Sequence, residues 1–71
     1  MDIKEVIGNN IKLHRIAINL SQEQLANDAD IDRTYLQSIE KGKRNVSINV
    51  LIRLSSALNV QLIKLLEDSI T

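Results

Sequence analysis

Polar residues of the types that can form hydrogen bonds with base edges are concentrated in the middle of the chain. Their spacing of one, three or four residues places them along one side of a helix: Arg33, Thr34, Gln37, Ser38 and Lys41. Arg and Gln make paired hydrogen bonds to base edges in the major groove, and Ser and Thr make single, adaptable ones. An ordinary surface helix would also have a polar side, but this side carries no acid that would repel phosphate. The pattern favours a helix that reads DNA sequence.

A basic segment follows this predicted helix. Its cations combine with the arginine at the helix start into a local positive patch: Arg33, Lys41, Lys43 and Arg44. The patch matters because Lys plus Arg and Asp plus Glu number nine each, which gives a formal net charge of zero. A DNA-binding protein usually gains affinity from an excess of positive charge. We therefore expect phosphate contacts from this patch and the neighbouring Asn45, and not from a general basic surface.

Five helix starts are indicated by one recurring signal, the hydrophobic-staple pattern. Each has an apolar residue, a capping residue, and a second apolar residue five positions after the first. The capping residues are Asp2, Ser21, Asp32, Ser47 and Gln61. Gln61 is a poor cap, which makes the fifth start the weakest. Two starts also have the spacing of a capping box, Asp2 with Glu5 and Ser21 with Gln24.

The predicted helix ends carry residues that tolerate left-handed backbone. These are Asn19, Asp30, Gly42 and Asn59. The helices would then span about 3–18, 22–29, 33–41, 48–58 and 62–68. No stretch alternates between apolar and polar residues with the period of a strand. The sequence therefore predicts an all-α fold of five helices.

The first predicted helix has one broad apolar face with a period near 3.6 residues. The face consists of Ile3, Val6, Ile7, Ile11, Ala17 and Ile18. His14 lies within it, and a metal ligand or a catalytic base would be one interpretation. The chain has no cysteine and no second histidine, and no nucleophile is evident nearby. We therefore interpret His14 as a buried or half-buried structural residue.

Composition narrows the class of protein. A chain of 71 residues predicts a single domain spanning positions 1–71. The chain has no cysteine, which excludes disulfides and zinc fingers and fits the cytoplasm. We expect neither a metal nor another cofactor. No apolar run is long enough to span a bilayer, and the amino end lacks a signal-peptide pattern. No paired carboxylates, glycine-rich phosphate loop or nucleophile–base pair is evident, so an enzyme is not expected.

Apolar residues near the carboxyl end exceed what the predicted core needs. The fourth and fifth helices each have an inward apolar face, and further isoleucines lie on their flanks. Clustered exposed apolar residues on a small chain favour a symmetric dimer contact. We expect the dimerisation region to cover about 48–71, with Ile52, Ile63, Leu66 and Ile70 at the interface.

The segment LSQEQLANDADIDRTYLQSIEKGKR resembles the helix-turn-helix of the Cro/C1-type (XRE) transcriptional regulators. The resemblance extends from Ile7 to Leu66 and includes ALNVQLIKLL. It implies a compact five-helix, lambda-repressor-like DNA-binding domain, with the helix-turn-helix at about 21–41. The tetrapeptide DRTY followed by EKGKRN is similar to controller proteins of restriction–modification systems, although other stand-alone regulators share these residues.

The resemblance also implies roles for individual residues. Arg33, Thr34, Gln37 and Ser38 would approach the bases. Gln22, Tyr35, Lys41, Lys43, Arg44 and Asn45 would lie along the DNA backbone. Arg15 and Glu40 occupy the positions of a structural ion pair. Three residues depart from the family pattern: Asp30 replaces the usual glycine of the turn, Val46 replaces a frequent proline, and His14 replaces leucine.

Two functions are consistent with these observations. The first is a sequence-specific transcriptional regulator, a homodimer that places its third helix in the major groove of a partly palindromic operator. The second is an antitoxin or protein-interaction module whose main partner is another protein, which the zero net charge supports. The chain has no room for a separate effector-binding domain, so no small-molecule effector is expected. Neither the operator sequence nor the direction of regulation follows from the residues.

Overall fold

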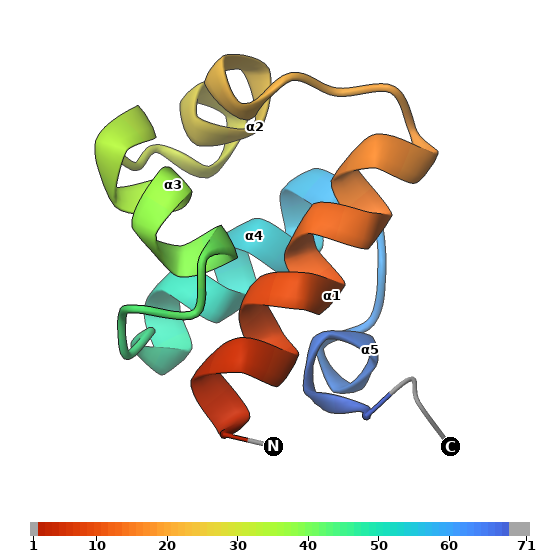
Figure 1. Ribbon diagram of the computed structural model, residues 1–71. Helices are drawn as coiled ribbons and strands as arrows, with labels where there is room; N and C mark the ends of the chain where they lie inside the picture. Colours follow the sequence, from red (N-terminus) through yellow and green to blue (C-terminus); the bar gives the residue numbers. More distant parts are fainter. Residues whose placement is uncertain (1, 69–71) are drawn as a thin grey trace.

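The computed structural model describes residues 2–68, and within this range it contains five helices and no strand. The helices are α1 (Ile3–Ala17), α2 (Gln22–Ala29), α3 (Arg33–Glu40), α4 (Ile48–Leu58) and α5 (Leu62–Leu66), shown in Figure 1. The predicted all-α, five-helix fold is confirmed. The fifth helix is shorter than predicted, because Glu67 has extended backbone angles of φ −75° and ψ 137° and ends it.

Four of the five predicted capping residues accept a hydrogen bond from the backbone of the helix that they precede. Ser21 accepts from Gln24 N, and Gln24 returns the bond to Ser21 N, which completes the predicted capping box. The weak cap expected at Gln61 makes no side-chain hydrogen bond. The capping box predicted for Asp2 and Glu5 is wrong. Asp2 accepts from the nearer Lys4 N, and the stem of Glu5 lies beside Gly42 instead.

All four residues predicted to adopt left-handed backbone do so. Their φ angles are 61° at Asn19, 57° at Asp30, 73° at Gly42 and 57° at Asn59. Asn, Asp and Gly pay the smallest steric cost for this conformation. Each residue turns the chain sharply after a helix, so the five helices can pack around one core.

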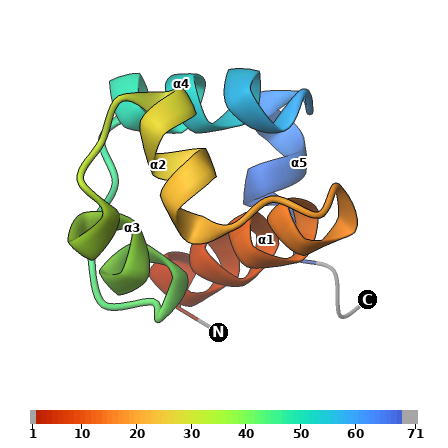
Figure 2. The same cartoon turned by 90° about the horizontal axis from the view of Figure 1, so that it is seen from above.

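The helices are arranged with α1 and α4 on opposite sides of the molecule. Figure 2 shows α2 and α5 between them, with α3 at one end and α5 towards the other. The core is aliphatic and includes side chains from every helix: Ile11, Leu25, Leu36, Ile39, Leu54, Leu58 and Leu65 are almost completely buried. Burying each such side chain is worth about 1.5–3 kcal/mol. This core fixes the position of α3, which at eight residues is too short to be stable alone.

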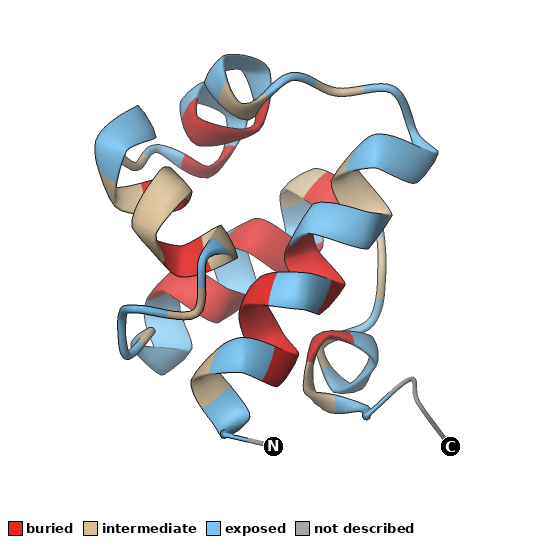
Figure 3. Ribbon diagram, viewed as in Figure 1, coloured by how far each residue is buried: buried red, intermediate tan, exposed pale blue. Residues whose placement is uncertain are grey.

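The buried stripe of α1 is narrower than predicted. Ile3, Ala17 and Ile18 are exposed, contrary to the expected apolar face, and Ile3 and Ile18 are 54% and 48% exposed. Figure 3 shows that the buried residues of α1 lie in its middle turns, whereas its two ends are mostly exposed or half-buried. His14 is half-buried, as expected. No group of residues that could hold a metal ion is found among positions 2–68.

Asn10 lies on the buried face of α1, which the sequence pattern did not indicate. It is only 4% exposed. Its side-chain Nδ2 donates to the carbonyl oxygens of Leu65 and Glu67, at 3.0 and 2.7 Å. Carbonyls at a helix end have no partner within the helix. Asn10 therefore ties the end of α5 to the middle of α1.

Gly8 allows α1 and α3 to approach each other closely. A Cβ atom added at this position would overlap the backbone carbonyl oxygen of Ile39. Any other residue would force the two helices apart.

Among the described residues, no helix is long and apolar enough to cross a membrane.

Candidate nucleic-acid interface

The outward side of α3 presents the polar residues predicted to contact bases. Arg33 and Thr34 are exposed, whereas Gln37 and Ser38 are half-buried. Asp32 caps the helix start: its carboxylate accepts from Thr34 N at 2.8 Å and complements the positive end of the helix dipole. Leu36 and Ile39 anchor the opposite side in the core. The core thus holds one side of α3, and its polar side remains accessible.

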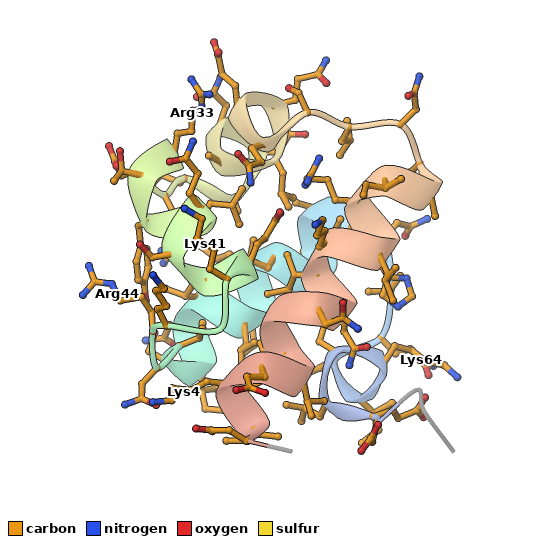
Figure 4. All side chains as sticks on the ribbon, in the orientation of Figure 1. Lys4, Arg33, Lys41, Arg44 and Lys64 are labelled. Carbon is orange, nitrogen blue, oxygen red and sulfur yellow. The ribbon has the colours of Figure 1, made fainter. Side chains whose placement is uncertain are left out.

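The basic residues of the predicted patch lie on the same side of the molecule as α3. Figure 4 shows Arg33, Lys41 and Arg44 on this side, whereas Lys64 lies on the opposite side, on α5. Lys41, Lys43, Arg44 and Asn45 are all exposed. The local positive patch predicted within a neutral chain is therefore adjacent to the polar side of α3.

Tyr35 organises the loop that carries this patch. The guanidinium carbon of Arg44 lies 5.3 Å from the centre of the Tyr35 ring, within the range of a cation–π contact. The Tyr35 hydroxyl donates to the carbonyl oxygen of Asn45 over 3.5 Å, a long hydrogen bond. Lys43 N also donates to Ser38 O at 3.1 Å, directly after the left-handed turn at Gly42. These contacts hold the start of the loop against α3.

Arg15 and Glu40 form an ion pair between α1 and α3. Arg15 Nε lies 2.7 Å from Glu40 Oε2, and Arg15 Nη2 donates to Glu40 Oε1 at 2.9 Å. The two side chains are only 12% and 4% exposed. The hydrogen bond to Glu40 raises the pKa of Arg15 above its ordinary value, with desolvation acting in the opposite direction. Because Glu40 is paired inside the molecule, residues 33–40 present no exposed carboxylate, and the exposed acid nearest to them is the capping Asp32.

Gln22 joins this network. Its Nε2 donates to Glu40 Oε1 at 3.0 Å. Arg15 reaches further to donate to Leu20 O at 2.9 Å, which fixes the connection between α1 and α2. A shallow depression of about 360 Å³ lies over this region, lined by Arg15, Ser21, Gln22, Glu23 and Arg33. The first turn of α2 and the start of α3 therefore border a common hollow.

Two exposed acids, Asp28 and Asp30, lie near the interface. Asp30 ends α2 in the left-handed conformation, and Asp28 is exposed on that helix.

The carbonyl oxygen of Ala29 accepts from Arg53 Nε at 2.9 Å. This bond joins the turn before α3 to α4. The contact spans 24 positions of sequence, and no local pattern indicated it.

The predicted dimer residues have mixed exposure. Ile52 and Ile63 are 49% and 55% exposed, and the neighbouring Ile48 is 61% exposed. Leu66 is half-buried against the core. Ile70 lies outside the described residues.

Comparison with known proteins gives consistent results across sequence and structure. A helix-turn-helix family model matches residues 11–65. Control protein C.SmaI of Serratia marcescens is 48% identical over 66 residues, which cover 93% of this chain and 79% of that protein. The restriction-modification controller protein C.AhdI of Aeromonas hydrophila superposes with a TM-score of 0.85 at 35% identity, over 87% of this chain and 94% of that one. The N-terminal DNA binding domain of SinR from Bacillus subtilis gives 0.86 at 34% identity, covering 94% and 99% of the two chains.

Proposed function

Because the chain belongs to the helix-turn-helix family of XRE-type, DNA-binding transcription regulators, we propose that it acts as a homodimeric controller of a specific operator. The observation that carries this proposal is the polar side of α3. It is accessible, carries no exposed acid from Arg33 to Lys41, and adjoins the positive patch of Arg33, Lys41, Lys43 and Arg44. In this proposal, residues 21–41 are the DNA-reading unit and residues 48–71 the dimerisation region.

Base recognition is assigned to the outward residues of α3. Arg33 and Thr34 are its most exposed polar residues near the helix start, and Gln37 and Ser38 lie one turn further along. An arginine bonded to two acceptors of a guanine discriminates by about 1–3 kcal/mol. Arg33 is therefore expected to carry the largest share of the discrimination.

Phosphate contacts are assigned to residues on both flanks of α3. Gln22 borders the hollow at the start of α2. Tyr35, Lys41, Lys43, Arg44 and Asn45 lie in or beside the loop after α3. Such contacts set the register of a protein on DNA without reading sequence themselves.

Dimerisation is assigned to the apolar flank of α4 and α5. Ile52 and Ile63 expose large aliphatic surfaces there, with Leu66 and Ile70 proposed beside them. Two recognition helices must lie about 34 Å apart to enter successive major grooves on one face of the duplex. The two-fold symmetry of the dimer would then match that of a partly palindromic operator.

The spacing of the half-sites tests the proposal. Wild-type protein is titrated against a duplex of the DNA upstream of its own gene, and against the same duplex with half a helical turn, about five base pairs, inserted between the half-sites. Tight binding should be lost on insertion and should not be restored by a full turn. A full turn returns both half-sites to one face but moves them about 34 Å further apart, beyond the span of a dimer with fixed helix spacing. Equal affinity for all three duplexes would contradict two-headed binding.

A second candidate is a module that binds mainly another protein. The zero net charge and the exposed Ile63 favour it. A gene for a separate toxin beside this one would support that function, whereas neighbouring methyltransferase and endonuclease genes would support a restriction–modification controller. The relatives are control proteins and a DNA-binding domain, and for this reason we favour the regulator.

A further inference from the structure

Glu40 holds more than the ion pair between α1 and α3. Its side chain is 4% exposed, and both carboxylate oxygens accept hydrogen bonds. Oε2 accepts from Arg15 Nε, whereas Oε1 accepts from Arg15 Nη2 at 2.9 Å and from Gln22 Nε2 at 3.0 Å. The same oxygen therefore connects the ion pair to the first turn of α2.

The chemistry of the carboxylate determines which end of the Gln22 amide faces it. An ionised carboxylate only accepts hydrogen bonds, whereas an amide has one accepting and one donating end of nearly equal shape. Turning the Gln22 oxygen towards Glu40 would bring two acceptors together in a poorly hydrated site. Glu40 therefore fixes Nε2 as the end that faces it. One N–H of that group is used, and the second N–H is left to donate to another acceptor.

We propose that Glu40 is a positioning residue for DNA binding, which holds the Gln22 amide by one N–H so that the other donates to a phosphate oxygen. The inference rests on the proposed function and deepens it, because it assigns a role in DNA affinity to a side chain that does not touch DNA. Gln22 borders the hollow that also contains Arg33, so a phosphate bound there would lie next to the reading helix.

A double-mutant cycle separates this role from a purely structural one. Affinity for the duplex upstream of the gene is measured for wild type, Gln22→Ala, Glu40→Gln and the double variant, at a temperature where circular dichroism shows all four folded. Loss of a hydrogen bond to a charged group predicts a roughly tenfold weaker Kd for Gln22→Ala. In Glu40→Gln, the single amide oxygen is taken by Arg15, and the new NH₂ group favours the oxygen end of the Gln22 amide, which turns the Gln22 donors away from the phosphate. The double variant should therefore bind no more weakly than Glu40→Gln alone.

Arg15→Lys is the matched control. It removes the two-bond fork between Arg15 and Glu40 but keeps a positive charge beside an acceptor-only carboxylate. The variant should lose stability, yet Gln22→Ala should still cost roughly tenfold in its background. If Glu40 acted only as a strut between helices, Glu40→Gln and Arg15→Lys would behave alike.

The possible results have distinct meanings. If the two losses multiply in the Glu40→Gln background, or if Gln22→Ala binds like wild type, the inference is overturned and the proposed function stands. If wild-type protein binds neither this duplex nor a random duplex at low salt, the proposed function fails and the inference fails with it.

A spectroscopic measurement on the wild-type protein removes any dependence on the folding of Glu40→Gln. The two side-chain amide protons of Gln22 should differ in nuclear magnetic resonance spectra of the free protein. The proton bonded to Glu40 should lie downfield and exchange more slowly with solvent. Equal exchange of the two protons would overturn the inference.

Discussion

Arg33 is exposed at the first position of α3, next to the hollow that it shares with Gln22. Arg33→Ala should weaken binding to the operator by about 1–3 kcal/mol and should relax the preference at one base position, because a bidentate contact to that base is lost. Competition binding with duplexes that differ at single positions measures both effects. An unchanged ranking of the duplexes would show that Arg33 does not read a base.

Lys43 is exposed in the loop after α3 and should contact phosphate only. Lys43→Ala should weaken binding to all sequences by the same factor. It should also reduce the slope of log Kd against log salt by about one, since one fewer counterion is released. Lys64→Ala is the matched control, because Lys64 lies on the opposite side of the molecule (Figure 4). A change in sequence preference for Lys43→Ala would contradict a pure phosphate role.

At the level of single residues, surface chemistry was easier to predict from sequence than buried chemistry. The polar side of α3 and the basic patch follow from residue type and spacing, which are local properties. Asn10 was missed because its partners, the carbonyls of Leu65 and Glu67, are 55 and 57 positions away. In the sequence, a polar residue within an apolar stripe indicates a gap in the buried face. Only the packed fold reveals that α5 ends against it.

α1 and α3 approach each other most closely at Gly8, where no side chain separates them. Gly8→Ala should destabilise the protein by about 1–3 kcal/mol, because the added methyl group must push α1 away from the backbone of α3. For a domain of this size, that loss corresponds to a fall in Tm of about 4–8 °C per kcal/mol. Thermal unfolding followed by circular dichroism measures it.

Asn9→Ala provides the control for this substitution. Asn9 is the next residue of α1 and is exposed, so alanine there meets no backbone and improves helix propensity. Its Tm should stay the same or rise slightly. A stable Gly8→Ala variant would show that α1 and α3 can separate at little cost.

At the level of helices, ends were predicted better than faces. Caps and left-handed turns depend on a few neighbouring residues, and for that reason Ser21, Asp30 and Asn59 could be assigned from sequence. The buried face of α1 depends on how far α3 and α5 extend over it. The isoleucines at 3 and 18 have the right period for that face, yet both are exposed, because burial depends on contacts between helices that a local pattern does not contain.

On the scale of the whole molecule, the dimer can be tested with one matched pair of substitutions. Ile63 and Ile16 are both 55% exposed, but only Ile63 belongs to the proposed interface. Ile63→Lys should convert a dimer into a monomer in sedimentation experiments and should weaken operator binding, because a buried lysine at the contact is costly. Ile16→Lys should leave both properties unchanged. A wild-type protein that is monomeric with and without DNA would contradict the assignment.

The whole-molecule properties were the hardest to obtain from one chain. Net charge is zero, and only the clustering of Arg33, Lys41 and Arg44 on one side explains how such a chain could hold DNA. Oligomeric state depends on a surface meeting its own copy, and no pattern within a single sequence encodes that geometry. Exposed isoleucines occur on α1 as well as on α4 and α5, so exposure alone did not identify the contact.

The two buried ties on α1 have a consequence for how such a protein can diverge. Asn10 fastens α5 to this helix, and five positions later Arg15 fastens α3 to it through Glu40. Because both residues belong to α1, this one helix fixes the distance between α3 and the proposed contact with a second copy. Substitutions on the outer side of α3 can change which bases are preferred without altering that distance. Changes around Asn10 would instead alter the permitted gap between half-sites. Base preference and half-site spacing can therefore change independently as such proteins diverge.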